Sequence, residues 1–157
     1  MVSNVRSYQV ILAIALPVWL SACASPLSTG ELRALSDAEA RWARRGFQDY
    51  TFETMRSCFC DPLVTQWARV EVRGGVATRV VSLETGAEVS PQQRGCFPTV
   101  DDLFDSVRGA TTDESVDDIK VDFDPVLGFP TRIILESKPD ILDGGSATYA
   151  RSVAPIS

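Results

Sequence analysis

The stretch Tyr50-Thr-Phe-Glu-Thr-Met-Arg-Ser-Cys58 decides the fold, because its side chains alternate with a period of two. Aromatic Tyr50 and Phe52 share one side of an extended chain, and Glu53 lies on the other. This alternation predicts a β-strand with one face on the core. The strand is expected to end before Pro62, since proline removes a donor from the ladder.

Two further segments with the same alternation follow this strand. In residues 67–73 apolar side chains alternate with charged ones, and residues 76–83 return toward them. Gly74-Gly75 between them predicts a two-residue hairpin turn, because both glycines can take a positive φ. Connections this short join antiparallel neighbours, so the sequence predicts three antiparallel strands.

A helix is predicted before these strands, over residues 31–45. Ser28 or Thr29 can cap its first turn, and Gly46 is typical of a C-terminal stop. One helical face is expected to carry Leu32, Leu35, Glu39 and Trp42, with Ala38 and Ala43 beside it. We expect Trp42 to pack on the sheet.

A second helix is predicted after the strands, between Pro98 and Gly109. Thr99 and Asp102 have the spacing of a capping box. The i, i+3, i+4, i+7 pattern of an amphipathic helix follows in Val100, Leu103, Phe104 and Val107.

Three more strands are predicted in residues 119–124, 129–136 and 148–153. The order is therefore helix, three strands, helix, three strands. Short connections favour antiparallel pairing, so we predict an α+β domain with a sheet of five to six antiparallel strands and both helices on one face.

The N-terminal segment ends in the stretch Leu20-Ser21-Ala22-Cys23. The apolar run from Val10 to Leu20 is shorter than the about 20 residues of a bilayer span, and it suits a signal peptide. The four residues resemble the lipobox of bacterial lipoproteins. That resemblance implies a signal peptide over residues 1–22, cleavage between Ala22 and Cys23, and acylation of Cys23.

Residues 23–30 are then expected to be a lipidated tether and residues 31–157 the single domain. Each buried methylene contributes about 0.8 kcal/mol, so two or three acyl chains bind the membrane firmly. Ala24 follows the cysteine, which resembles lipoproteins of the outer membrane facing the periplasm in bacteria with two membranes. The alternative is an ordinary secretory signal with a chance cysteine.

Charge and composition exclude several classes of function. Arg6 is the only charged residue before Cys23, so the mature chain would hold 14 basic and 21 acidic side chains, a net charge of −7. This disfavours a nucleic-acid partner. The chain has no histidine, which removes Ser-His-Asp and Cys-His catalysis and histidine metal sites. We therefore predict that the protein is not an enzyme and that it has no cofactor and no metal site. In particular, the acidic residues between 101 and 124 lack the spacing of a calcium loop.

Cys58, Cys60 and Cys96 remain as candidate thiols once Cys23 is acylated. An oxidising compartment favours one structural disulfide, which would pair Cys96 with Cys58 or Cys60. A bridge between Cys58 and Cys60 is the alternative, strained if the backbone there is extended. Three thiolates could instead bind a soft metal such as copper(I) or do redox work.

Several motifs of the chain occur together: Trp42, Tyr50-x-Phe52, Cys58-x-Cys60, Val70-x-Val72-x-Gly-Gly, Thr99-Val-Asp-Asp-Leu-Phe104, and Val121-x-Phe-Asp-Pro125 followed by Gly128-Phe-Pro130. In combination they resemble a family of small bacterial exported proteins and lipoproteins known only as a domain of unknown function. The resemblance covers residues 40–153 and implies no activity, cofactor or ligand.

The sequence therefore predicts a membrane-anchored protein-binding or structural module of the cell envelope, with an envelope protein as partner. A thiol-based soft-metal or redox accessory protein of the envelope is the alternative function.

Overall fold

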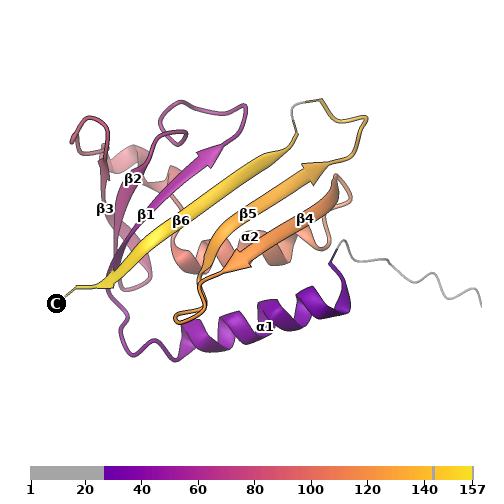
Figure 1. The fold of residues 1–157 in the computed structure, drawn as a ribbon. Coiled ribbons are helices and arrows are strands. Elements are labelled where there is room, and N and C mark those ends of the chain that lie inside the picture. The colour runs from indigo at the N-terminus through magenta and orange to yellow at the C-terminus, as the bar shows by residue number, and fades with distance from the viewer. Residues whose placement is uncertain (1–26, 143, 157) are drawn as a thin grey trace, which may run out of the picture.

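The computed structural model describes residues 27–142 and 144–156 (Figure 1). The chain forms two helices and six strands in the predicted order: α1 (Thr29–Ala43), β1 (Tyr50–Ser57), β2 (Ala68–Arg73), β3 (Val76–Ser82), α2 (Val100–Ala110), β4 (Val116–Phe123), β5 (Pro130–Ser137) and β6 (Ser146–Pro155). A 3-10 helix at Pro91–Cys96 lies between β3 and α2. The predicted α+β class is confirmed.

One antiparallel sheet holds all six strands in the order β3-β2-β1-β6-β5-β4. Each set of three strands is joined by short connections, as predicted. The junction between the two sets is the pairing of β1 with β6, which brings Thr54 opposite Ala150. This pairing joins the two sets of three strands into one continuous sheet.

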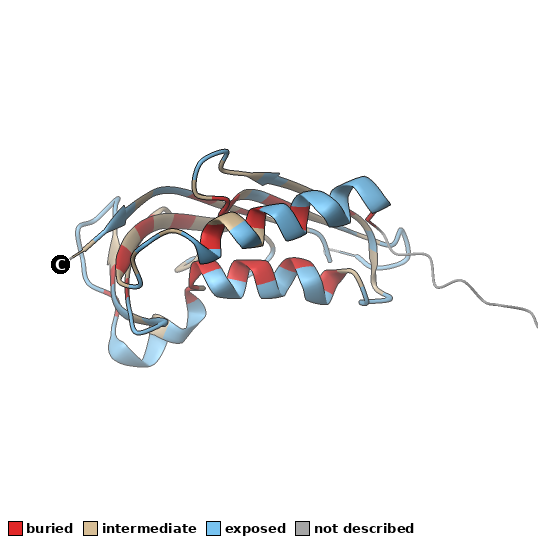
Figure 2. Ribbon diagram, turned by 90° about the horizontal axis from the view of Figure 1, so that it is seen from below, coloured by how far each residue is buried: buried red, intermediate tan, exposed pale blue. Residues whose placement is uncertain are grey.

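Both helices lie on the same side of this sheet. Figure 2 shows that their buried residues face the sheet and each other, while their outer sides are exposed. In α2 the buried side chains are those of the predicted apolar face, extended by one residue: Val100, Leu103, Phe104, Val107 and Ala110. The predicted capping box of Thr99 and Asp102 is confirmed.

Helix α1 packs through part of the predicted face, from which Leu32 and Glu39 depart. Its buried residues are Leu35, Ala38 and Trp42, whereas Leu32 is 41% exposed. Glu39 does not face the core but forms an ion pair with Arg108 of α2. Small Ala38 is the contact point with the rest of the domain, so the helix is rotated away from the face that Leu32 would define.

An aromatic cluster connects α1, β1 and α2. The Trp42 ring packs edge-on against Tyr50 with ring centroids 5.2 Å apart. Its indole Nε1 donates a hydrogen bond of 2.9 Å to Asp101 Oδ1 in the first turn of α2. The Tyr50 hydroxyl accepts a hydrogen bond of 3.1 Å from the backbone N–H of Val100, the first residue of α2. The predicted packing of Trp42 on the sheet is therefore confirmed.

The turn between β4 and β5 packs tightly against α1. Asp124 Oδ1 accepts hydrogen bonds from the backbone N–H groups of Val126 and Leu127, and Gly128 takes a φ of 86°. A Cβ atom on Gly128 would lie 2.3 Å from the carbonyl oxygen of Ala38. In the motif Asp-Pro-x-x-Gly-Phe-Pro, the glycine therefore completes the turn and also allows the turn to contact α1 at a distance that only glycine permits.

Substitution Gly128→Ala is expected to destabilise the domain more than Gly86→Ala. Gly86 also has a positive φ, of 72°, but no atom lies within 4 Å of its Cβ position. The left-handed conformation costs alanine about 1–2 kcal/mol at either site, and the clash at Gly128 adds about 1–3 kcal/mol. Urea denaturation measures both differences. Equal losses of unfolding free energy in the two variants would show that the turn does not pack tightly against α1.

The stability of the domain is expected to decrease at alkaline pH through Tyr50. Burial raises the pKa of Tyr50 to about 12, whereas an unfolded chain releases this proton near pH 10. Below pH 10 the stabilisation is complete, and it is lost as the pH rises from about 10 to about 12. The free energy of unfolding should fall by about 2–3 kcal/mol over this range.

Denaturation of Tyr50→Phe at several pH values tests this assignment. The variant is expected to be less stable at neutral pH, because the Val100 N–H loses its acceptor, but to lose the alkaline dependence that Tyr50 causes. Tyr149→Phe serves as the control and should keep that dependence. An unchanged alkaline slope in Tyr50→Phe would contradict the assignment.

Candidate functional site

The predicted cleavage and lipidation residues, Ala22 and Cys23, lie outside the described residues, so their roles remain predictions. Leu27 is the first residue that the structure describes, and it is buried, with 5% of its surface exposed. In the described part of the chain, no helix has the length and apolar character that crossing a membrane requires.

The N-terminal junction is part of the folded domain. Ser28 caps α1, since its Oγ accepts from the Glu31 N–H and Glu31 accepts from the Ser28 N–H at 2.8 Å. The Ser28 hydroxyl also donates to Glu31 Oε2 at 2.7 Å, and this bond, followed by the one from the Ser28 N–H, lowers the pKa of Glu31. Residues 27–30, which the sequence analysis assigns to the tether, are thus held by the burial of Leu27 and by the N-cap of α1.

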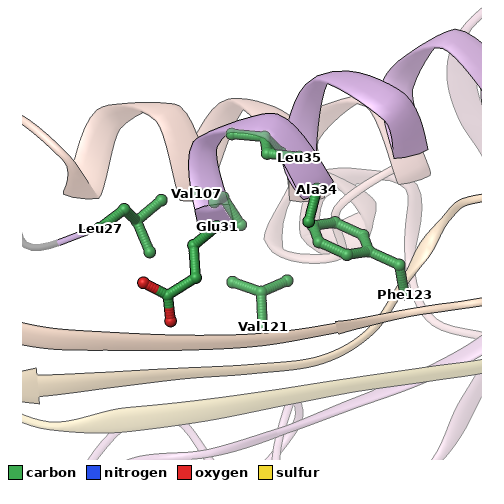
Figure 3. Close-up of a pocket in the computed structure, with 7 residues that line it drawn as sticks. All are labelled: Leu27, Glu31, Ala34, Leu35, Val107, Val121 and Phe123. Atoms are coloured by element: carbon green, nitrogen blue, oxygen red, sulfur yellow. The ribbon is translucent and has the colours of Figure 1, made fainter. Parts of the chain in front are cut away.

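Leu27 fills the edge of an apolar cavity between α1, α2 and β4. The cavity has a volume of about 30 Å³, enough for one or two water molecules. Figure 3 shows Glu31 as the charged residue among the side chains that line it: Leu27, Ala34, Leu35, Val107, Val121 and Phe123. This packing fixes the point at which the domain begins.

Cys58 and Cys60 form a disulfide, with Cα atoms 5.3 Å apart, and Cys96 is a free, exposed cysteine. The favoured prediction, a bridge from Cys96 to one of the other two, is not what the structure contains. Strand β1 ends at Ser57, and the chain bends through residues 58–60. The extended backbone on which the strain argument depended is therefore absent at this pair.

Cys96 lies in the same region as the disulfide without joining it. It lines a small hollow with residues on both sides of the Cys58–Cys60 bend, Arg56 and Val64. With two thiols oxidised, one thiolate is left for a soft metal. Within residues 27–142 and 144–156, no group of three or more His, Cys, Asp or Glu side chains is arranged to hold a metal ion.

The side of the sheet away from the helices, here called the open face, carries a cluster of aromatic and charged side chains. Glu53 of β1 accepts hydrogen bonds from Arg69 of β2 and from Arg151 of β6, each at 2.9 Å. The Arg151 guanidinium lies 3.9 Å from the ring centroid of Trp67, the residue before β2. Three adjacent strands thus hold a Trp–Arg–Glu–Arg arrangement.

Glu53 is the centre of this cluster. Only 12% of its side-chain surface is exposed, against 57% for Arg69 and 54% for Arg151. The hydrogen bonds and charges of the two arginines, Arg69 foremost, lower the pKa of the Glu53 carboxyl, although partial burial opposes this. The carboxylate therefore stays charged and holds both guanidinium groups in place.

Further half-exposed side chains continue the open face toward β4. Tyr149 of β6 lies between Met55 of β1 and Arg132 of β5 in the strand register. Arg132 in turn donates a hydrogen bond of 2.7 Å to Asp122 of β4. These residues are not among the candidate site residues predicted from the sequence. The signal was present, however, because they occupy the strand positions that alternate with the buried ones.

The fold and the open face define an α+β domain that presents one side of an antiparallel sheet. Residues 34–155 match the model described as "Family of unknown function (DUF6174)", so the chain belongs to this family. The match runs from within α1 to the last residue of β6 and confirms the resemblance to a domain of unknown function. No curated protein and no solved structure matches the chain.

Alkylation without reduction is expected to label Cys96 and to spare Cys58 and Cys60. Trypsin separates these residues, since cleavage after Arg56 and Arg94 gives fragments 57–69 and 95–108. Mass analysis of unfolded, unreduced protein should find the label on fragment 95–108, and on fragment 57–69 only after reduction. A Cys96→Ser control should leave fragment 57–69 equally protected. A mixed disulfide between the two fragments would contradict the pairing.

Proposed function

We propose that the protein is a lipoprotein anchored through Cys23 and that its domain binds another protein of the cell envelope through the open face. The observation that carries this proposal is the Trp67–Arg151–Glu53–Arg69 cluster on the side of the sheet that the helices leave uncovered. The lipobox resemblance and the short apolar N-terminal run support the anchor.

The residue types of the open face favour a protein partner. Trp, Tyr, Met and Arg are enriched in protein interfaces, and Trp, Tyr and Arg dominate their binding energy. Here Trp67, Tyr149, Met55 and the arginines lie on neighbouring strands. A solvated sheet face without a partner would need charged residues but no such concentration of large aromatic and guanidinium groups.

The cluster is also ordered before a partner arrives. Glu53 holds Arg69 and Arg151 by charge-assisted hydrogen bonds, and Arg151 is stacked on Trp67. Ordering a long side chain on binding costs about 0.5–1.5 kcal/mol, and prior ordering reduces this cost. An arrangement that is already rigid therefore suits recognition better than free surface arginines.

The sheet edges are less suited to a partner than the face. Beyond β3, Ser82 donates to the Ala87 carbonyl and Val89 donates to the Val80 carbonyl, which occupies part of that edge. Strand β4 carries charged side chains at Asp117, Asp118, Lys120 and Asp122, and charges on an edge strand oppose strand addition. Both features direct a partner to the open face.

Site-specific photo-crosslinking in cells tests the proposed surface. With benzoylphenylalanine in place of Tyr149, we expect one discrete adduct with a single envelope protein. The same probe at Asp37, exposed on the outer side of α1, is the matched control and should give no such adduct. Combining the Tyr149 probe with Trp67→Ala and Arg151→Ala should reduce the adduct at least tenfold, because these residues form the centre of the surface.

Two results would contradict this function. The first is the same set of adducts from positions 149 and 37, which would indicate random collision. The second is an adduct at position 149 that survives the loss of Trp67 and Arg151 undiminished in a variant shown to be folded.

A further inference from the structure

The burial of Leu27 determines how far the domain can lie from a lipid at Cys23. Four residue steps separate Cys23 from Leu27, and a fully extended chain spans at most about 3.3–3.6 Å per residue, or about 14 Å in total. Since Leu27 is held in the cavity between α1, α2 and β4, a domain anchored at Cys23 must lie with this end close to the membrane surface.

The β5–β6 loop lies at the same end of the molecule. Glu31 in the first turn of α1 is close enough to Asp118 of β4 to interact electrostatically. Next to Asp118, the start of β4 pairs with the end of β5, where Lys138 N–H donates to the Ser115 carbonyl. Figure 1 shows the start of α1 and the β5–β6 loop on the right, and the β4–β5 turn and the C-terminus on the left.

The described part of this loop exposes apolar side chains toward solvent. Leu142 is 89% exposed and its neighbour Ile141 is 39% exposed. At the opposite end of the sheet, the β4–β5 turn exposes Val126 to 77%. Phe59, in the connection after β1, is 89% exposed at the same end as Leu142, and Val76 at the β2–β3 turn is 63% exposed at the opposite end. Of these residues, Leu142 and Phe59 are at the end that the anchor would hold near lipid.

We propose that the β5–β6 loop contacts the bilayer surface, with Leu142 at the boundary between headgroups and acyl chains. This inference rests on the proposed anchoring at Cys23. Acidic side chains close to the loop, among them Asp117, Asp118 and Asp140, would be repelled by anionic lipid. The contact therefore suits a zwitterionic surface, and the acyl chains supply the affinity while Leu142 fixes the orientation.

Such an orientation has a consequence for the open face. The strands would stand with their β1–β2 and β5–β6 ends toward the membrane and their β2–β3 and β4–β5 turns away from it. The open face, which lies along the strands, would then point sideways rather than into the bilayer. A partner in the same membrane or beside it could reach Trp67 and Arg151.

Tryptophan fluorescence of the full-length, lipidated protein in vesicles tests the orientation. Leu142→Trp is compared with Val126→Trp in phosphatidylcholine vesicles with and without bromine atoms on the acyl chains near the headgroups. Signal from Trp42 and Trp67 is subtracted with the unsubstituted protein. We expect bromolipid to quench the tryptophan at position 142 at least twofold more than that at position 126. Adding phosphatidylglycerol should reduce the difference.

Flotation of the same samples separates failure of the anchor from failure of the orientation. If the lipidated protein floats with the vesicles and Cys23→Ser does not, the anchor stands, and equal quenching at positions 142 and 126 would overturn the orientation alone. If the protein does not float, both the anchor and the orientation that rests on it are overturned. Both substituted positions are exposed loop sites, so the variants are expected to fold.

Discussion

The contact of Trp42 and Tyr50 with the first turn of α2 is the constraint on which the rest of the structure depends. Tyr50 is fully buried, its ring meets Trp42 edge-on, and its hydroxyl accepts the N–H of Val100. One strand residue thereby holds both helices on the same side of the sheet. The opposite side is left uncovered, and the open face exists because of this asymmetry.

The placement of both helices on this side of the sheet determines where the other features lie. Because α1 is fixed by Trp42, its Ala38 carbonyl meets the turn at Gly128, and its N-terminus carries Leu27 into the cavity beside α2 and β4. The first described residues are therefore packed against the core. A lipid at Cys23, as proposed, would act on this end of the domain.

The elements and their layering could be predicted from the sequence, but the strand order and the contacts between distant residues could not. Alternation, Gly74-Gly75 and the capping residues identified the strands, the hairpin and α2. On α1 the buried residues Leu35, Ala38 and Trp42 lie on or beside the predicted face, but the pattern alone could not show that Leu32 would be exposed. The Glu53–Arg151 pair spans 98 positions and depends on β1 pairing with β6, which no local pattern encodes. The Cys58–Cys60 disulfide depends on the bend of the chain after Ser57, which the sequence pattern did not predict.

The intact mass of the protein extracted from its own membranes tests whether the domain is anchored through Cys23, as proposed. We expect a chain that begins at Cys23 and carries the added mass of a diacylglyceryl group, with or without a further acyl chain. A chain of any length without acyl mass would contradict the anchor and with it the membrane orientation, and would leave the open face as the surface of a free protein.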